Sequence, residues 1–374
     1  MKRILITSTD LMMVQFLLPH VKHLCANGYE VEIACSEVGG RLDEVREKAE
    51  PYVKAVHEVR LRRNPLSPTN IKGYGDMKRV MQNGHYDIIW TNEPVMGVVT
   101  RLCAKKLRKQ GTKVMYMVHG FHFFTGAPTL NWMIYYPIEK LMANYADLIV
   151  TVNTEDYQRA QSFNVKEVKY IHGIGINTER LTIGEERGNI RKELGLGEND
   201  FIVLSVGELN RNKNQRTIIK AIAKVADKDV HYLMCGKGDQ HDNLVALAKE
   251  MGLEHNIHFL GYRNDVVDIC SQADVYVMPS FREGLPVSSL EAMYCGLPLL
   301  TSNIRGLVDV NHDGKNGFLC APTDVDGFAE GIRRLKADDA KRAEMGELNR
   351  KEVVPFTIEQ TKTEVLNIIK ELMS

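Results

Sequence analysis

The segment VYVMPSFREGLPVSSLEAM, residues 275–293, combines a strand, a polar loop and the start of a helix. Its first four residues are apolar, which predicts a buried strand over 275–278. Pro286 stands where a helix would begin, since its fixed φ suits the first helical position. Ligands in α/β sheets bind beyond the carboxyl ends of parallel strands. The segment therefore predicts an α/β fold with a ligand site in this loop.

The same order of strand, loop and helix recurs along the chain. In the first half, apolar runs predict strands over residues 3–7, 31–35, 87–91, 113–118 and 148–152. In the second half they predict strands over 201–206, 231–235, 257–260, 275–278, 299–301 and 317–319. Helical periodicity is found at 11–26, 98–109, 135–145, 216–226 and 358–373. Strands that alternate with helices predict parallel sheets covered on both faces.

A polar, loop-rich segment over 177–200 separates two halves, each long enough for its own core. We expect two Rossmann-like domains, one over 1–177 and one over 178–355, facing each other across a cleft. The last segment, 356–374, should form a helix that packs back onto the first domain. The functional loops should then be those that follow the apolar strands.

The composition excludes some functions. The 374 residues include 48 Lys and Arg and 48 Asp and Glu, and a general nucleic-acid binder would carry a basic excess. The seven cysteines lack metal-binding spacings and predict reduced core residues of a cytoplasmic protein. No apolar run suits a signal peptide or a membrane span, so we expect at most peripheral contact with a membrane.

The loop after strand 201–206 supplies candidate ligand contacts. Gly207 permits a tight turn, and Arg211 and Lys213 place two cations just beyond the strand. A diphosphate leaving group needs positive charge where its own charge grows, and an Arg fork with a Lys point charge supplies it. The alternative is an ordinary solvated loop.

Two further loops carry weaker signals. Gly236 and Gly238 follow strand 231–235, and two glycines allow backbone to approach a ligand closely. Tyr262 and Arg263 follow the next strand, where an aromatic ring and a backbone edge would frame a nucleobase. Taken singly, each pattern is also typical of a plain turn.

The quoted loop predicts the most specific site. We expect the amides of residues 287–289 to lack helical partners and so to suit a diphosphate. Two carboxylates, Glu283 and Glu291, suit the hydroxyl groups of a sugar and a ribose. The alternatives are compensation of the helix dipole by Glu283 and a solvated position for Glu291. The candidate contacts of this loop are Glu283, Gly284, Leu285, Pro286, Val287, Ser288 and Glu291.

Glu283 and Glu291, separated by seven intervening residues within Arg-Glu-Gly-Leu-Pro-x-Ser-x-Leu-Glu-Ala, resemble the E-x7-E motif of family-4 glycosyltransferases with the GT-B fold. The resemblance covers nearly the whole chain and is strongest to bacterial capsule, exopolysaccharide and O-antigen enzymes. It implies retaining transfer of a sugar from a nucleotide diphosphate, with a UDP-sugar favoured, to a glycan or lipid-linked acceptor. It also implies that no metal or other cofactor is required.

The resemblance implies a role for individual residues. Glu283 would contact the donor sugar and Glu291 the ribose. Arg211 and Lys213 would hold the diphosphate, and His119 would lie close to the transferred sugar.

The sequence departs from the family pattern at three places. Glu208 stands where many relatives have Arg, and residues 8–13 form a predicted loop without the glycines that are common after the first strand. Residues 92–94, Asn-Glu-Pro, replace a histidine-containing turn.

The first half carries the candidate acceptor residues. His119 follows strand 113–118, where a ligand-binding residue belongs, although a histidine that caps a turn is the alternative. The aromatic stretch 121–136 is explained either by core packing or by contact with a membrane surface. Basic residues that would meet anionic lipid are Arg60, Arg62, Arg63, Lys105, Lys106, Arg108 and Lys109.

Other functions remain open at this point. A nucleotide-sugar epimerase of the same fold would share the phosphate and ribose contacts, and a non-catalytic scaffold would keep only the fold. A nicotinamide-dependent oxidoreductase would need Gly-x-Gly-x-x-Gly after a first strand, which this chain lacks. Asp324-x-Asp326 resembles a metal-binding motif of another transferase fold but lies outside the main set of loops.

Overall fold

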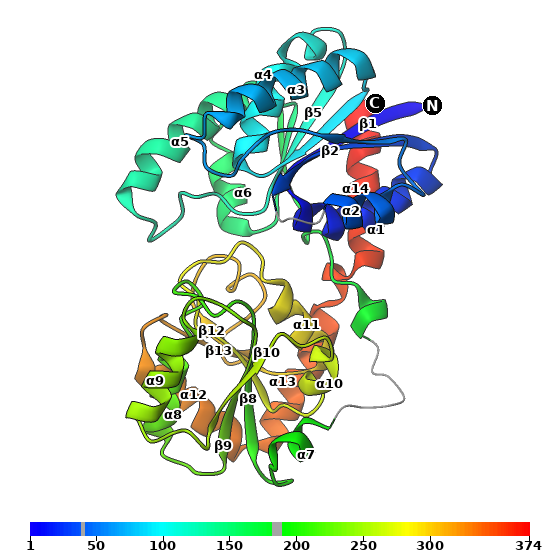
Figure 1. Cartoon of the computed structure of the whole chain (residues 1–374). Coiled ribbons are helices and arrows are strands. Elements are labelled where there is room, and N and C mark those ends of the chain that lie inside the picture. The colour runs from blue at the N-terminus through cyan, green and yellow to red at the C-terminus, as the bar shows by residue number, and fades with distance from the viewer. Residues whose placement is uncertain (39–41, 182–188) are drawn as a thin grey trace. The chain divides into compact units, whose positions relative to one another are not determined.

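The computed structural model describes residues 1–38, 42–181 and 189–374, and the chain divides into two compact units (Figure 1). Unit 1 comprises Met1–Gly175 and Ile358–Ser374, and unit 2 comprises Ile176–Thr357. Each division lies two residues from the expected boundary. The last helix, α14 (Ile358–Met373), contacts α1 (Leu11–Ala26) and so belongs to unit 1.

Unit 1 is built on a seven-stranded sheet in the order β3-β2-β1-β4-β5-β6-β7, with every pair parallel. Its strands are β1 Lys2–Asp10, β2 Tyr29–Val38, β3 Ala55–Glu58, β4 Ile88–Asn92, β5 Lys113–Val118, β6 Leu148–Thr151 and β7 Glu167–Tyr170. Its other helices are α2 Leu42–Ala49, α3 Thr69–Gly84, α4 Pro94–Arg108, α5 Thr129–Ala143 and α6 Thr154–Ala160. Helices α3, α4 and α5 contact one another in turn, whereas α1 contacts α2 and α14 (Figure 1).

Unit 2 repeats the arrangement with a six-stranded sheet in the order β10-β9-β8-β11-β12-β13, again parallel. Its strands are β8 Phe201–Val206, β9 Val230–Cys235, β10 Ile257–Gly261, β11 Val275–Met278, β12 Leu299–Ser302 and β13 Gly317–Cys320. Its helices are η1 Thr178–Leu181, α7 Ile190–Leu194, α8 Gln215–Val225, α9 His241–Glu250, α10 Val266–Cys270, α11 Val287–Cys295, α12 Val325–Ala337, α13 Asp339–Glu352 and η2 Val354–Phe356. In both sheets the first strand of the unit lies next to the fourth, which is the doubly wound arrangement.

The central strands are apolar because helices cover both faces of each sheet. Residues 201–205 of β8 and all of β11 are buried, and the two apolar clusters of unit 2 lie on opposite sides of these strands. The prediction of two Rossmann-like domains is therefore confirmed.

The structure corrects the prediction at the start of the chain. Strand β1 runs to Asp10 and α1 begins at Leu11, so residues 8–13 are not a loop. The predicted strands also omitted β3 and β7, which form the two edges of the sheet. Edge strands are only half covered, and these two contain no fully buried residue, which leaves no apolar run to recognise. Within the described residues, no helix combines the length and the apolar character needed to cross a membrane.

Candidate functional site

The site in unit 2 is centred on an ion pair between two of the predicted residues. Lys213 Nζ lies 2.8 Å from Glu283 Oε1, and the two side chains are 21% and 11% exposed. Lys213 follows β8 and Glu283 follows β11, strands that are adjacent in the sheet although 70 residues separate the two side chains. The sheet order thus places a cation and a carboxylate together beyond the carboxyl ends of two parallel strands.

Hydrogen bonds to backbone carbonyls fix the two loops that carry this pair. Asn212 Nδ2 donates to the Arg282 carbonyl at 2.9 Å, and the Phe281 amide donates to the Asn212 carbonyl at 2.9 Å. Buried Arg305 donates from Nε to the Glu283 carbonyl at 3.1 Å. Sequence reasoning missed Arg305, because nothing in a lone arginine between β12 and β13 predicts a contact with a loop more than twenty residues earlier.

Asn214, a second residue that the sequence analysis did not predict, also holds these loops in place. Its buried side chain donates to the carbonyls of Pro279 and Pro322, at 3.0 and 2.7 Å, and its backbone adopts a left-handed conformation with φ of 55°. Asparagine is among the few residues that adopt this conformation readily. The local signal was the Asn residue directly before helix α8, but its long-range partners come from the tertiary structure.

The N-terminus of α11 differs in two details from the prediction. Pro286, with φ of −80° and ψ of 106°, is the residue before the helix rather than its first residue. The Ser289 amide donates to the Pro286 carbonyl at 3.1 Å, so it is paired, because the first turn closes onto Pro286. Among the described residues, the amides of Val287 and Ser288 have no such partner. Two donors rather than three are therefore available at this helix end.

Side chains of α11 contribute polarity next to these amides. Buried Tyr276 of β11 donates its hydroxyl hydrogen to Ser288 Oγ at 2.8 Å. Burial raises the pKa of the Glu291 carboxyl, whereas the positive charge of Arg180 in η1 acts in the opposite direction. Arg180 was not predicted, since its position near Glu291 depends on how η1 packs against α11.

The predicted glycines allow close approach of two loops. A Cβ added at Gly236 would lie 1.9 Å from the Gly207 carbonyl oxygen, and one at Gly238 would lie 2.1 Å from the Leu209 carbonyl oxygen. Gly207 itself has φ of 151°, and its amide donates to the Cys235 carbonyl at 2.9 Å. The structure therefore explains these glycines by contact between loops, and contact with a ligand stays a prediction.

The remaining predicted residues of unit 2 lie around this centre in different environments. Tyr262 is 72% exposed, and Leu285 and Val287 pack against the apolar cluster beside α11. Arg263 pairs with Glu193 and Asp265, both at 2.7–2.8 Å, and these carboxylates raise its pKa. A Cβ added at Gly306 would lie 2.1 Å from the Gly284 carbonyl oxygen and would clash with it.

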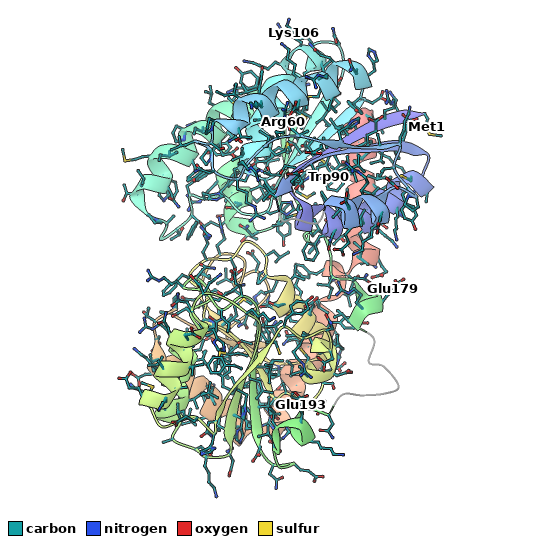
Figure 2. The ribbon with its side chains drawn as sticks, in the orientation of Figure 1. Met1, Arg60, Trp90, Lys106, Glu179 and Glu193 are labelled. Atoms are coloured by element: carbon teal, nitrogen blue, oxygen red, sulfur yellow. The ribbon has the colours of Figure 1, made fainter. Side chains whose placement is uncertain are left out.

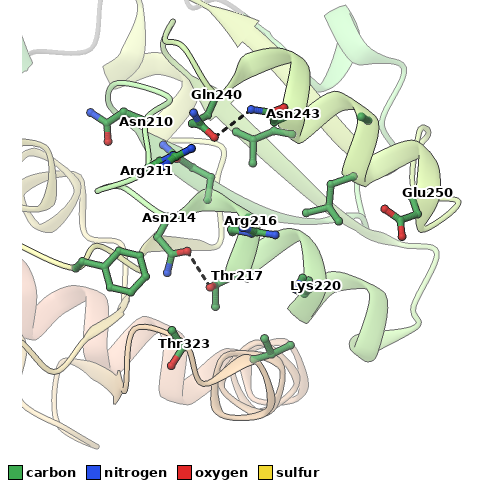
Figure 3. A pocket seen from close by; sticks show the side chains of 16 residues that line it. Asn210, Arg211, Asn214, Arg216, Thr217, Lys220, Gln240, Asn243, Glu250 and Thr323 are labelled. Atoms are coloured by element: carbon green, nitrogen blue, oxygen red, sulfur yellow. Dashed lines mark hydrogen bonds between the residues drawn. The ribbon is translucent and has the colours of Figure 1, made fainter.

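Arg211 lies in a separate pocket. This pocket, about 850 Å³ in volume, is lined by residues of α8, α9 and the loops before them, including Arg211, Gln240 and Asn243, together with Phe281, Thr323 and Val325 (Figure 3). Lys213 and Glu283 are not among its lining residues. Of the two predicted cations, only Lys213 contacts Glu283 in the part of the chain that the structure describes.

In unit 1, His119 lies at the carboxyl end of β5 and contacts the end of β4. Its Nε2 is 3.0 Å from Asn92 Oδ1, while Asn92 Nδ2 donates to the Thr7 carbonyl at 3.1 Å. Because the amide oxygen of Asn92 faces the ring, Nε2 carries the proton and Nδ1 is left as an acceptor. Burial lowers the pKa of His119 to about 4, so the ring is neutral near pH 7.

His119 lines a pocket of about 240 Å³ together with Glu93, His122, Tyr135 and Glu139. Glu93 is a residue that sequence reasoning noted but gave no role. Its backbone has φ of 65°, and its carboxylate accepts from Ser8 Oγ and the Thr9 amide, each at 2.6 Å. A strained non-glycine backbone that surrounding hydrogen bonds hold in place is found at many functional turns.

The aromatic stretch of unit 1 is mainly core. Phe121, Phe123 and Phe124 are buried, and His122 stacks on Tyr135 with ring centroids 4.6 Å apart. The Asp324-x-Asp326 pattern is also structural, since Asp324 caps α12 by accepting from the Gly327 amide at 2.8 Å.

Comparison with known proteins agrees with this architecture. Residues 14–180 match the model of Glycosyltransferase Family 4, and residues 186–352 match that of Glycosyl transferases group 1. The putative glycosyltransferase EpsD of Bacillus subtilis is 35% identical, over 100% of this chain and 97% of its own length.

Two more distant proteins share most of the chain. The UDP-Gal:alpha-D-GlcNAc-diphosphoundecaprenol alpha-1,3-galactosyltransferase of Escherichia coli is 26% identical, over 83% of this chain and 81% of its own. The crystal structure of Anabaena HepE in complex with UDP and glucose superposes with a TM-score of 0.81 at 19% identity, covering 99% of this chain and 100% of that one. The fold, the two matched family models and the relative that spans the whole chain show that this protein belongs to the family-4, group-1 glycosyltransferases with the GT-B fold.

Proposed function

We propose that this glycosyltransferase moves a hexose from a UDP-sugar to a glycan or lipid-linked acceptor in the synthesis of a bacterial surface polysaccharide, with retention of configuration. The observation that carries the proposal is the Lys213–Glu283 pair, 2.8 Å apart, in which Glu283 belongs to the loop that leads into α11. The first two amides of α11 have no partner among the residues that the structure describes. The relative that is named as acting on a diphosphoundecaprenol-linked sugar and the neighbour that holds UDP and glucose support the donor and acceptor classes.

The donor would bind to unit 2. The diphosphate would take the amides of Val287 and Ser288 and the ammonium group of Lys213, which supply positive charge where the leaving group becomes negative. Glu283 would then accept hydrogen bonds from sugar hydroxyls, and Glu291 from the ribose. Because the ammonium group and the two amide N–H dipoles can stabilise the charge of the diphosphate, we propose that the reaction proceeds without a divalent metal.

The acceptor would bind to unit 1 in the pocket around His119. As its hydroxyl oxygen forms a bond to the anomeric carbon, the bond from that carbon to the diphosphate oxygen breaks on the same face. The acceptor proton passes to the departing phosphate oxygen. His119, neutral and with Nδ1 unprotonated, would accept a hydrogen bond from a hydroxyl group of the sugar or the acceptor.

The test is a panel of UDP-, GDP- and dTDP-sugars, with release of nucleotide measured for the wild type, Lys213→Ala and Glu283→Ala. We expect UDP release from one donor, loss of release in both variants and no change with EDTA. Release of a free sugar epimer without acceptor would indicate the epimerase instead. Absence of binding to any nucleotide sugar would refute the proposal.

The stereochemistry requires a separate measurement. We expect NMR of the initial product to show the anomeric configuration of the donor, whereas the opposite configuration would rule out retention.

A further inference from the structure

Helix α5 of unit 1 presents an apolar stripe to solvent. Its members, which we call the α5 stripe, are Leu130, Met133, Ile134, Ile138 and Leu141, with exposures of 63%, 70%, 42%, 42% and 58%. Steps of three and four residues place them on one face of the helix. A surface helix normally turns such a stripe toward the core and shows polar side chains to water, so the orientation of α5 is reversed.

A buried network holds α5 in this orientation. Arg101 of α4 pairs with Glu139 of α5 at 2.8 Å, and both side chains are at most 5% exposed. Tyr116 of β5 donates its hydroxyl hydrogen to the same carboxylate at 3.0 Å. Trp132 of α5 packs toward buried Phe123, with ring centroids 5.7 Å apart. The inner face of α5 is thus occupied by the ion pair and the aromatic rings, and the stripe points outward.

The helices beside the stripe are strongly basic. Helices α3, α4 and α5 contain two acidic residues, Asp76 and Glu139, and both are buried and paired with arginine. The basic residues of the same helices are Lys72, Lys78, Arg79, Arg101, Lys105, Lys106, Arg108 and Lys140. The whole chain carries no net charge, so this surface concentrates positive charge on one part of unit 1.

Several of these cations are exposed to solvent. Lys105, Lys106 and Lys140 are exposed, as is Lys109 directly after α4. Figure 2 shows Lys106 at the outer edge of unit 1. Other predicted cations are engaged: Arg60 pairs with Asp76, and Arg108 pairs with Asp147. Lys105 Nζ lies 3.9 Å from the centroid of the Tyr145 ring, and Arg108 donates to the Asn144 carbonyl, so the end of α4 lies beside the end of α5 that carries Leu141. The flanking lysines are Lys105, Lys106, Lys109 and Lys140.

We infer that the α5 stripe and its flanking lysines bind the surface of an anionic lipid bilayer. Aliphatic side chains without polar groups suit the boundary between headgroups and acyl chains, and lysines on long stems reach the lipid phosphates. With 15 residues, α5 is about 22 Å long, shorter than the roughly 30 Å hydrocarbon core. It therefore lies along the surface of the bilayer. The inference does not depend on the identity of the sugar donor.

The experiment is co-sedimentation of the full chain with vesicles of phosphatidylglycerol mixed with phosphatidylcholine, or of phosphatidylcholine alone. We expect binding to the anionic vesicles, weakened by salt, and little binding to the neutral ones. Met133→Glu with Leu141→Glu should weaken binding by at least about tenfold. Lys106→Glu with Lys109→Glu should weaken it by more than about 25-fold, at about fivefold for each lysine lost.

Matched controls lie on unit 2. Val245→Glu replaces a 41% exposed apolar residue of α9, and Lys351→Glu reverses a 71% exposed lysine of α13, and neither should change binding. Circular dichroism melts and nucleotide-sugar binding identify variants that fail to fold. Equal sedimentation of the wild type and both double variants would overturn the inference. The inference would also be overturned if the wild type did not bind vesicles and instead formed a dimer that Met133→Glu with Leu141→Glu dissociates.

Discussion

Replacing Lys213 by Met tests the central pair of the site most directly. The change removes the ammonium group 2.8 Å from Glu283 and keeps an unbranched side chain that fills similar space. If this group stabilises the charge that develops on the diphosphate, its removal resembles the loss of one transition-state donor. Such losses cost about 3–4 kcal/mol, or about 10²–10³-fold in kcat.

The effect on folding should be much smaller. Both side chains of the pair keep some contact with water, so the loss of the pair should cost about 1 kcal/mol in the free energy of unfolding. The assay is steady-state release of UDP with saturating acceptor, combined with a urea melt of each variant. The matched control is Lys224→Met, which removes a half-exposed lysine that pairs with Asp326 at the far end of α8. It should leave kcat unchanged.

The double variant Lys213→Met with Glu283→Gln refines the test. If the two residues act as a unit, their combined loss in kcat will be much less than the product of the single losses. A folded Lys213→Met protein with kcat within threefold of the wild type would refute the assignment of Lys213 to the diphosphate.

Three other predictions concern the packing and the protonation of the fold. Gly236→Ala should lower the free energy of unfolding by about 3 kcal/mol, because its Cβ would lie 1.9 Å from a carbonyl oxygen. The control Gly195→Ala, whose Cβ would meet open space, should lower it by about 1 kcal/mol. Equal losses in urea melts would contradict the packing argument. Arg101→Met should lower the free energy of unfolding by about 3–5 kcal/mol, because the charge of Glu139 would be buried without its partner. In thermal melts, adding Glu139→Gln should recover part of this loss. If it does not, the unpaired charge is not the cause. The pKa of His119 falls from 6.5 to about 4 on folding, so the unfolded chain binds the proton first as the pH falls. The wild type should lose up to about 3 kcal/mol relative to His119→Gln between about pH 8 and pH 4, with no difference in slope above about pH 8, and parallel stability curves would disprove burial of the neutral ring.

Strong local patterns explain which elements were predicted well. The strands over 113–118, 201–206 and 275–278 and the helix over 358–373 have the predicted bounds in the structure. These strands are central and apolar, and the last helix carries a clear apolar face. The edge strands β3 and β7 were missed, because a strand that is covered on one side carries too few apolar residues to stand out from a loop.

Local patterns were less reliable where backbone hydrogen bonds decide the geometry. Proline favours the first helical position, yet Pro286 precedes α11 and accepts the amide of Ser289. The absence of glycine in residues 8–13 agrees with what is found, a strand that passes directly into a helix. The orientation of α5 was not predicted either. The sequence left core packing and a membrane surface as alternatives for the whole aromatic stretch 121–136, whereas in the structure its phenylalanines are buried and the aliphatic residues of α5 are exposed.

The sequence by itself determined the fold class, the family and the types of side chain in the candidate site. The reason is that the alternation of strands and helices and the spacing of Glu283 and Glu291 are local properties of the chain. Only the tertiary structure decided which of these residues meet. Lys213 contacts Glu283 across 70 residues, whereas Arg211 lines a pocket to which neither of these residues contributes, although the two cations are neighbours in the sequence. The physical reason is that contacts such as Lys213–Glu283, Arg305–Glu283 and Arg101–Glu139 depend on sheet order and helix packing. No periodicity along the chain encodes these.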